Sequence, residues 1–193
     1  MGPGAPLQAR PVDMGLPSGV QWALCNVGAA RPSDLGLFFS WGNIDGHSIG
    51  EGYDFTLDVY NSTPAAAINT NLSLGQDAAR ANLGAPWRMP SADEFQELFD
   101  NCTTVFTTLN GVNGLLFTSN MNGNTLFFPA AGDYNGTSHN GRGTNGYYWS
   151  STWRSEMPTA IRNPEMNFLL YELSDWSASA MASLVMTCAT SSI

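Results

Sequence analysis

The chain of 193 residues contains no lysine, and its seven basic residues are all arginine. A Walker A phosphate loop and a Schiff-base mechanism both require a lysine, so both are excluded. The arginines are scattered along the chain, and 16 acidic residues bring the formal net charge to −9. Nucleic-acid-binding domains cluster basic residues to neutralise phosphates, so we expect no nucleic-acid partner.

Charged residues of any kind make up only 12% of the chain, well below the ~25% typical of soluble domains. No apolar run reaches the ~18 residues that a membrane-spanning helix needs, so we expect no membrane insertion. The three cysteines, Cys25, Cys102 and Cys188, lack metal-like spacing. They fit either one disulfide with a leftover thiol or three buried free thiols.

Hydrophobic residues make up 43% of the chain, and aromatic residues 11%. This is enough for the core of one domain, which we place over residues 10–193. Residues 1–9 have no signal-peptide features and predict a flexible leader or a cloning remnant. Alternating or apolar runs predict strands at these positions: 12–16, 20–25, 36–42, 115–118, 125–132, 168–173 and 182–188. Residues 43–72 predict no regular element.

Two segments predict helices. Residues 76–83 are rich in helix formers and end before Gly84, a residue typical of helix C-terminal caps. Ser91 and Glu94 form a capping box, which predicts that a second helix begins there. Its apolar stripe contains Phe95, Leu98, Phe99 and Cys102 at helical spacing.

Six Asn-Gly pairs follow the helices and predict tight turns between short strands. Their asparagines are Asn110, Asn113, Asn122, Asn135, Asn140 and Asn145. Two grouped helices followed by a strand-rich half indicate the α+β class.

Five motifs, spread from residue 12 to residue 152, follow one another in a fixed order. They are Val12 to Ala29, Phe39-Ser40-Trp41-Gly42, Trp87 to Ser91 with Glu94 to Leu98, Phe128 to Gly132, and Tyr148 to Thr152. In this order they resemble the Fibrobacter succinogenes major paralogous domain family, which is abundant in gut Bacteroidetes. Trp22, Trp41, Trp87 and Trp149 lie inside these motifs, so we expect them in the core.

The resemblance implies a C-type-lectin-like fold, with two helices, a small mostly antiparallel sheet and long loops. It also implies a secreted, cell-surface or virion-associated protein without catalytic residues or cofactors. Similar folds serve as variable proteins of diversity-generating retroelements, in which adenine-directed mutation rewrites a C-terminal segment. The tail departs from the family's usual ending at Leu184–Cys188, which fits a diversified C-terminus.

The genetic code sharpens this hypothesis. Randomising the adenines of asparagine codons that end in a pyrimidine cannot produce Trp, Met, Glu, Gln or Lys. In the segment 153–182 the residues of these types would then be unvaried framework. They are Trp153, Glu156, Met157, Glu165, Met166, Glu172, Trp176 and Met181.

We therefore expect a non-enzymatic domain that binds a protein or glycan on a cell surface through this segment. Tryptophans would anchor the ligand, and polar side chains would give specificity. The predicted contacts are Trp153, Arg154, Thr159, Ile161, Arg162, Asn163, Tyr171, Ser174, Asp175, Trp176 and Ser177. The alternative is a structural module of a surface lipoprotein or pilus-like assembly. An enzyme akin to the formylglycine generators is a third reading.

Other candidate chemistry has a simpler interpretation. His47 and His139 lie in glycine-rich stretches without further zinc ligands, so we expect exposed loop histidines. The carboxylates between residues 45 and 58 lack a calcium-loop pattern, although calcium binding there is an alternative. Cys188 has apolar sequence neighbours and no base beside it in sequence, which favours a buried structural thiol.

Overall fold

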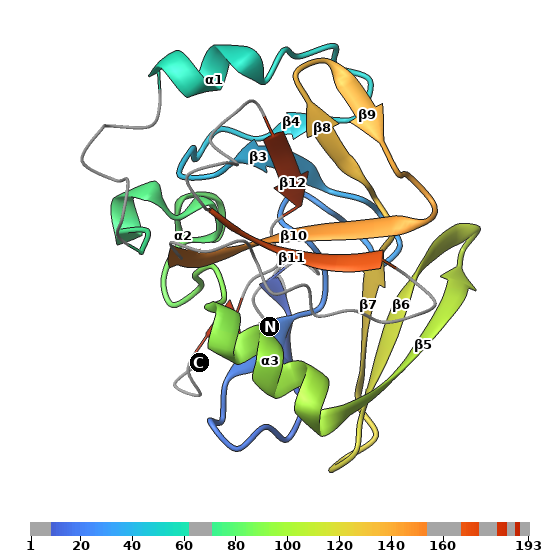
Figure 1. Ribbon diagram of the computed structural model, residues 1–193. Helices are drawn as coiled ribbons and strands as arrows, with labels where there is room; N and C mark the ends of the chain where they lie inside the picture. Colours follow the sequence, from blue (N-terminus) through green and yellow to red (C-terminus); the bar gives the residue numbers. More distant parts are fainter. Residues whose placement is uncertain (1–8, 62–70, 154–166, 174–180, 185–187, 190–193) are drawn as a thin grey trace, which may run out of the picture.

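The structure is a computed structural model that describes residues 9–61, 71–153, 167–173, 181–184 and 188–189. In these residues it has the predicted α+β class, with short helices beside three small sheets (Figure 1). Strands β10, β11 and β12 run parallel where they pair, and the other strand pairs are antiparallel. In the described part of the chain, no helix has the length and apolar composition to cross a membrane.

The first sheet joins the beginning of the chain to its end. Its order is β1-β2-β13, with β1 Pro11–Asp13, β2 Gln21–Ala23 and β13 Cys188–Ala189. The predicted strand at 182–188 is therefore wrong as one element. Met181–Leu184 forms β12 in a different sheet, because it pairs with β3 whereas Cys188 pairs with Trp22 of β2.

The largest sheet has seven strands, with the path β11-β10-β12-β3-β4 and with β8 pairing both β12 and β9. Its strands are β3 Leu37–Ser40, β4 His47–Ser48, β8 Asp133–Asn135, β9 Ser138–Asn140, β10 Asn145–Trp153, β11 Asn167–Leu173 and β12 Met181–Leu184. The predicted strands at 36–42 and 168–173 are thereby confirmed as β3 and β11.

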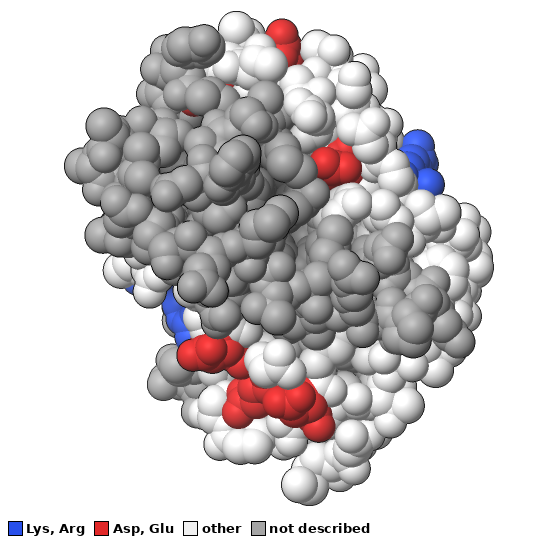
Figure 2. Space-filling model, in the orientation of Figure 1, with Lys and Arg blue, Asp and Glu red and all other residues white. Residues whose placement is uncertain are grey.

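The third sheet is an uninterrupted meander of order β5-β6-β7, which lies to one side in Figure 1. Its strands are β5 Cys102–Leu109, β6 Val112–Ser119 and β7 Thr125–Pro129. Residues 101–132, which contain the whole sheet, include no charged residue. Figure 2 shows how sparse charge is on the face that it draws, where acidic atoms gather near the position of α3 and basic ones are isolated.

Two of the six predicted Asn-Gly turns are wrong. Asn113 and Gly114 lie inside β6, where they pair with Thr108 and Thr107 of β5. Asn145 begins β10 instead of preceding it. The dipeptide makes a turn only where the strand register ends, as at Asn110, whose φ of 49° and the φ of 79° at Gly111 close the β5–β6 hairpin.

The described helices are α1 Thr56–Asn61, the 3-10 helix η2 Leu74–Gln76, α2 Ala78–Leu83 and α3 Ala92–Asn101. The two predicted helices are confirmed as α2 and α3. Ser91 accepts a hydrogen bond from the Glu94 N–H at 3.2 Å, and Glu94 accepts one from the Ser91 N–H at 2.8 Å, which completes the predicted capping box. Helix α1 and strand β4 were not predicted, and both lie in the stretch 43–72.

The main core lies between α3 and the sheets. Phe95 and Leu98 of α3 are fully buried, and the Phe95 ring packs edge-on against Trp22 at 5.1 Å between ring centroids. The four tryptophans of the family-like motifs are all buried, as predicted. Trp41 and Trp149 belong to a second cluster, which also includes Phe39 and Met89. Strand β10 contributes one buried residue to each cluster, Tyr148 to the main core and Trp149 to the second.

Candidate functional site

The described residues contain two of the predicted ligand contacts. Trp153 is the last residue of β10, and Tyr171 lies in β11 opposite Trp149 of β10. The other nine predicted contacts lie outside the described residues: Arg154, Thr159, Ile161, Arg162, Asn163, Ser174, Asp175, Trp176 and Ser177.

Strands β10 and β11 end side by side. Their parallel register runs from Asn145 opposite Asn167 to Trp153 opposite Leu173, with one irregularity between Trp149 and Trp153. Residues 154 and 174, which begin the two groups of predicted contacts, directly follow these paired strand ends. Both groups therefore begin at the same end of the sheet.

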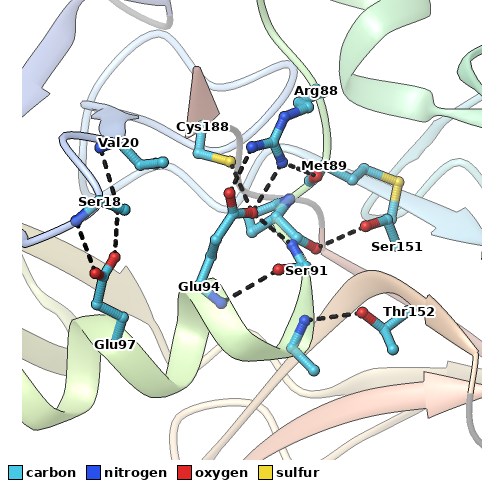
Figure 3. A network of polar contacts seen from close by, with 12 residues as sticks. Ser18, Val20, Arg88, Met89, Ser91, Glu94, Glu97, Ser151, Thr152 and Cys188 are labelled. Carbon is cyan, nitrogen blue, oxygen red and sulfur yellow. Dashed lines mark hydrogen bonds and ion pairs between the residues drawn. The ribbon is translucent and has the colours of Figure 1, made fainter. Parts of the chain in front are cut away.

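The end of β10 is fixed to the segment 88–92, which we call the clasp. The Ser151 N–H donates to the Pro90 carbonyl at 2.8 Å, and the Ser151 hydroxyl donates to the same oxygen at 3.2 Å. The Ala92 N–H donates to the Thr152 hydroxyl oxygen at 3.0 Å. The exit of the predicted contact segment from β10 therefore has a defined position (Figure 3).

The clasp also holds the chain beyond the segment. The Arg88 N–H donates to the Cys188 carbonyl at 3.1 Å, and the Cys188 N–H donates to the Arg88 carbonyl at 3.0 Å. On its other side Cys188 pairs with Trp22 of β2. Residues 88–92 thus bind the chain both before and after the predicted contact segment.

An ion pair supports this arrangement. The two terminal guanidinium nitrogens of Arg88 donate to the two carboxylate oxygens of Glu94, one at 2.8 Å. Burial alone would raise the pKa of the Glu94 carboxyl, but the hydrogen bonds from Arg88 and Ser91 and the Arg88 charge outweigh it, so its pKa lies below the ordinary value. The hydrogen bond to Glu94 raises the pKa of Arg88. Both groups are therefore charged in neutral solution.

Cys188 differs from its predicted surroundings. Its side chain is fully buried, as expected, but its sulfur lies 3.5 Å from Glu94 Oε2, so a carboxylate is nearby after all (Figure 3). Burial and the negative charge of Glu94 raise the pKa of the thiol. The S–H form donates to the carboxylate, and this setting disfavours the thiolate that nucleophilic chemistry requires.

All three cysteines are free and buried, which decides between the two alternatives that the sequence left open. Burial raises the pKa of Cys25 and of Cys102 to about 11. Neutral thiols in such places act as small apolar core residues.

The histidines are not the exposed loop residues that the sequence predicted. His47 lies in β4 and stacks on Tyr53 at a centroid distance of 3.4 Å, while its Nδ1 contacts Glu51 at 2.9 Å. His139 lies in β9 and stacks on Tyr134 at 4.6 Å, and its Nε2 contacts the Ala131 carbonyl at 2.7 Å. Both rings are partly buried because aromatic neighbours cover them.

These rings belong to an aromatic array that the sequence did not reveal. Phe55 contacts both Tyr53 and Tyr134, at 5.1 and 5.2 Å, and so connects the two stacked pairs. The members come from segments far apart in the chain and follow no periodic pattern. The array joins β4 and the start of α1 to the β8–β9 hairpin, and thereby supports β12, which pairs with β8.

Three of the four carboxylates considered for calcium accept hydrogen bonds from protein groups. Asp58 is buried and accepts hydrogen bonds from the Ser40 hydroxyl at 2.7 Å and the Tyr53 hydroxyl at 2.6 Å. Asp54 accepts from the Thr56 N–H and hydroxyl. Among the described residues, no three His, Cys, Asp or Glu side chains are grouped as metal ligands would be.

Comparison with known proteins found no matching family model, no matching curated protein and no matching solved structure.

Proposed function

We propose that this protein is a non-enzymatic ligand-binding domain with a C-type-lectin-like fold, related to the Fibrobacter succinogenes major paralogous domain family. Its ligand is a protein or a glycan on a cell surface. A gut bacterium or a phage presents the domain outside the cell or on the virion. Five ordered sequence motifs and the α+β architecture support the fold and the family.

One observation carries the binding proposal. The last residues of β10 and β11, Trp153 and Leu173, are paired in parallel register. Two separate stretches rich in predicted contact residues therefore start from one end of a sheet, as the parts of a single surface would. The rigid core beneath Trp149 and the clasp support such a surface, because a preorganised scaffold lowers the entropy cost of binding.

The chemistry of the clasp favours binding over catalysis. The Cys188 sulfur, on the residue that pairs with Arg88 of the clasp, is buried and protonated beside Glu94. The hydrogen bonds of the carboxylate itself serve the helix cap and Arg88. These groups therefore hold the chain in place.

Alanine substitution at the predicted anchors tests the proposal. Labelled protein is applied to a glycan array and to intact gut-bacterial cells, and binding is compared among the wild type, Trp153→Ala and Trp176→Ala. Val105→Ala is the matched control, since Val105 is 51% exposed on β5 of a separate sheet. We expect the anchor variants to lose at least about tenfold in affinity with unchanged melting temperature, as hot-spot residues do.

The opposite result has a clear meaning. If the anchor variants melt at lower temperature or precipitate while Val105→Ala does not, the segment is a structural element packed against a partner domain.

The proposed diversification is tested separately, by sequencing the genomic surroundings of the gene. We expect a near-repeat of the codons for 153–182 that differs only at template adenines. Differences scattered over all bases would contradict diversification and leave the binding proposal standing.

A further inference from the structure

The six Asn-Gly pairs differ in how firmly the structure holds their side-chain amides. In five of them the asparagine amide nitrogen donates a hydrogen bond. The bonds are Asn110 to Ser33 Oγ at 3.2 Å, Asn113 to the Gly143 carbonyl at 3.1 Å, Asn122 to the Asp13 carbonyl at 2.9 Å, Asn140 to the Ser138 carbonyl at 3.2 Å and Asn145 to the Tyr147 hydroxyl at 2.8 Å. Asn135 is exposed, and its side chain makes no hydrogen bond within the described part of the chain.

Asn135 also ends a strand, while the Gly136 that follows it is buried and its carbonyl accepts the Phe55 N–H at 3.3 Å. Asn135 is the last residue of β8, so its pairs with Ser138 and with Met181 are the terminal pairs of two ladders. Terminal pairs open at low free-energy cost. The N–H of Gly136, which has a φ of 60° in the turn, donates to no group among the described residues. By contrast, the Gly123 N–H is held by the Ser119 carbonyl at 3.1 Å.

We propose that Asn135 is a site of spontaneous deamidation in the folded protein. The Gly136 backbone nitrogen loses its proton to water and attacks Cγ of Asn135. The new N–Cγ bond forms as the Cγ–Nδ2 bond breaks, and ammonia leaves with the transferred proton. Water then opens the cyclic imide at either carbonyl, which gives an aspartyl or an isoaspartyl residue at position 135. Glycine favours this step because it has no side chain to hinder the approach.

The modification would act on the support of the tail. Deamidation would add a negative charge to a turn that already lies beside a carboxylate, since Asp54 Oδ1 is 3.5 Å from the place of a Cβ on Gly136. The isoaspartyl form also lengthens the main chain by one methylene where β8 pairs with Met181, the first residue of β12. Both changes weaken the pairing that holds β12 between β3 and β8.

Peptide mass spectrometry of the full chain tests this proposal. The protein is incubated in mildly alkaline buffer, folded in one sample and urea-denatured in another, and amide loss is measured at all six asparagines. In the folded sample we expect Asn135 to react about tenfold faster than the five asparagines whose hydrogen bonds must first break. In urea we expect the six rates to agree within a few-fold, since the sequence pair is the same.

Two variants sharpen the result. Asn135→Gln should remove the dominant acidic species on isoelectric focusing, because glutamine forms the larger cyclic imide far more slowly. Asn140→Gln, in the neighbouring pair, should leave that species unchanged. The proposal is overturned if Asn135 reacts no faster than the other five in the folded chain. It is equally overturned if Asn140→Gln removes the dominant species.

Discussion

Loss of one partner from the Arg88–Glu94 pair should destabilise the clasp by a defined amount. The Arg88 and Glu94 side chains are 29% and 16% exposed. The energy of the pair should therefore lie between that of an exposed ion pair and that of a buried one. Exposed ion pairs contribute at most about 1 kcal/mol, and breaking a buried pair costs about 3–5 kcal/mol. We expect Glu94→Gln to lower the free energy of unfolding by about 2 kcal/mol. Glutamine also satisfies a capping box, so the helix cap survives and the loss reports the ion pair.

Urea unfolding of the wild type, Glu94→Gln, Arg88→Met and the double variant measures the coupling. Once one charge is gone, removing the other should cost little, so the double variant should lose much less free energy of unfolding than the sum of the two single losses. Glu97→Gln is the control, because Glu97 is on the same helix but accepts hydrogen bonds from Ser18 without an ion pair in the described contacts. Additive losses within about 0.5 kcal/mol would refute the coupled clasp.

Three further outcomes follow from the described contacts. Phe95→Ala should lower the free energy of unfolding by about 3–5 kcal/mol in thermal denaturation, because Phe95 is fully buried against Trp22. Trp149→Phe should lower it by about 1–3 kcal/mol, since the Phe39 carbonyl loses its 2.7 Å donor. The folded-state pKa of Glu94 is depressed, so its stabilisation is full above the unfolded-state pKa and is lost as the pH falls through the folded-state pKa. Stability curves of the wild type and Glu94→Gln should therefore converge at low pH; parallel curves would contradict this.

Features that depend on near neighbours could be predicted from the sequence. Ser91 and Glu94 are three residues apart, and that spacing alone brings each side chain to the other's backbone N–H. The ion pair of Glu94 with Arg88 and its contact with Cys188 depend on how the chain folds back. Cys188 is distant in sequence and reaches Glu94 only because β13 docks between β2 and Arg88. No local pattern encodes that contact.

The turns and the short helix show a second limit. Asn110-Gly111 and Asn113-Gly114 are identical dipeptides, yet only the first is a turn, since one hairpin accommodates one reversal and the register decides which. Helix α1 has no apolar stripe from which the sequence could predict it. Its buried Asp58 is held by Ser40 and Tyr53, and such a polar anchor looks like an ordinary loop carboxylate in sequence.

Within the span 153–187, strands β11 and β12 are paired in the large sheet, so each connection between successive strands joins two fixed ends, as a closed loop does in polymer physics. The entropy lost on closing such a loop grows only with the logarithm of its length, and doubling the length costs about 0.6 kcal/mol. Insertions and deletions between the strands of this span are then cheap in free energy, as long as Pro90, Arg88 and Cys188 keep their contacts. A lineage could vary the length of its tail as well as its composition without remaking the scaffold.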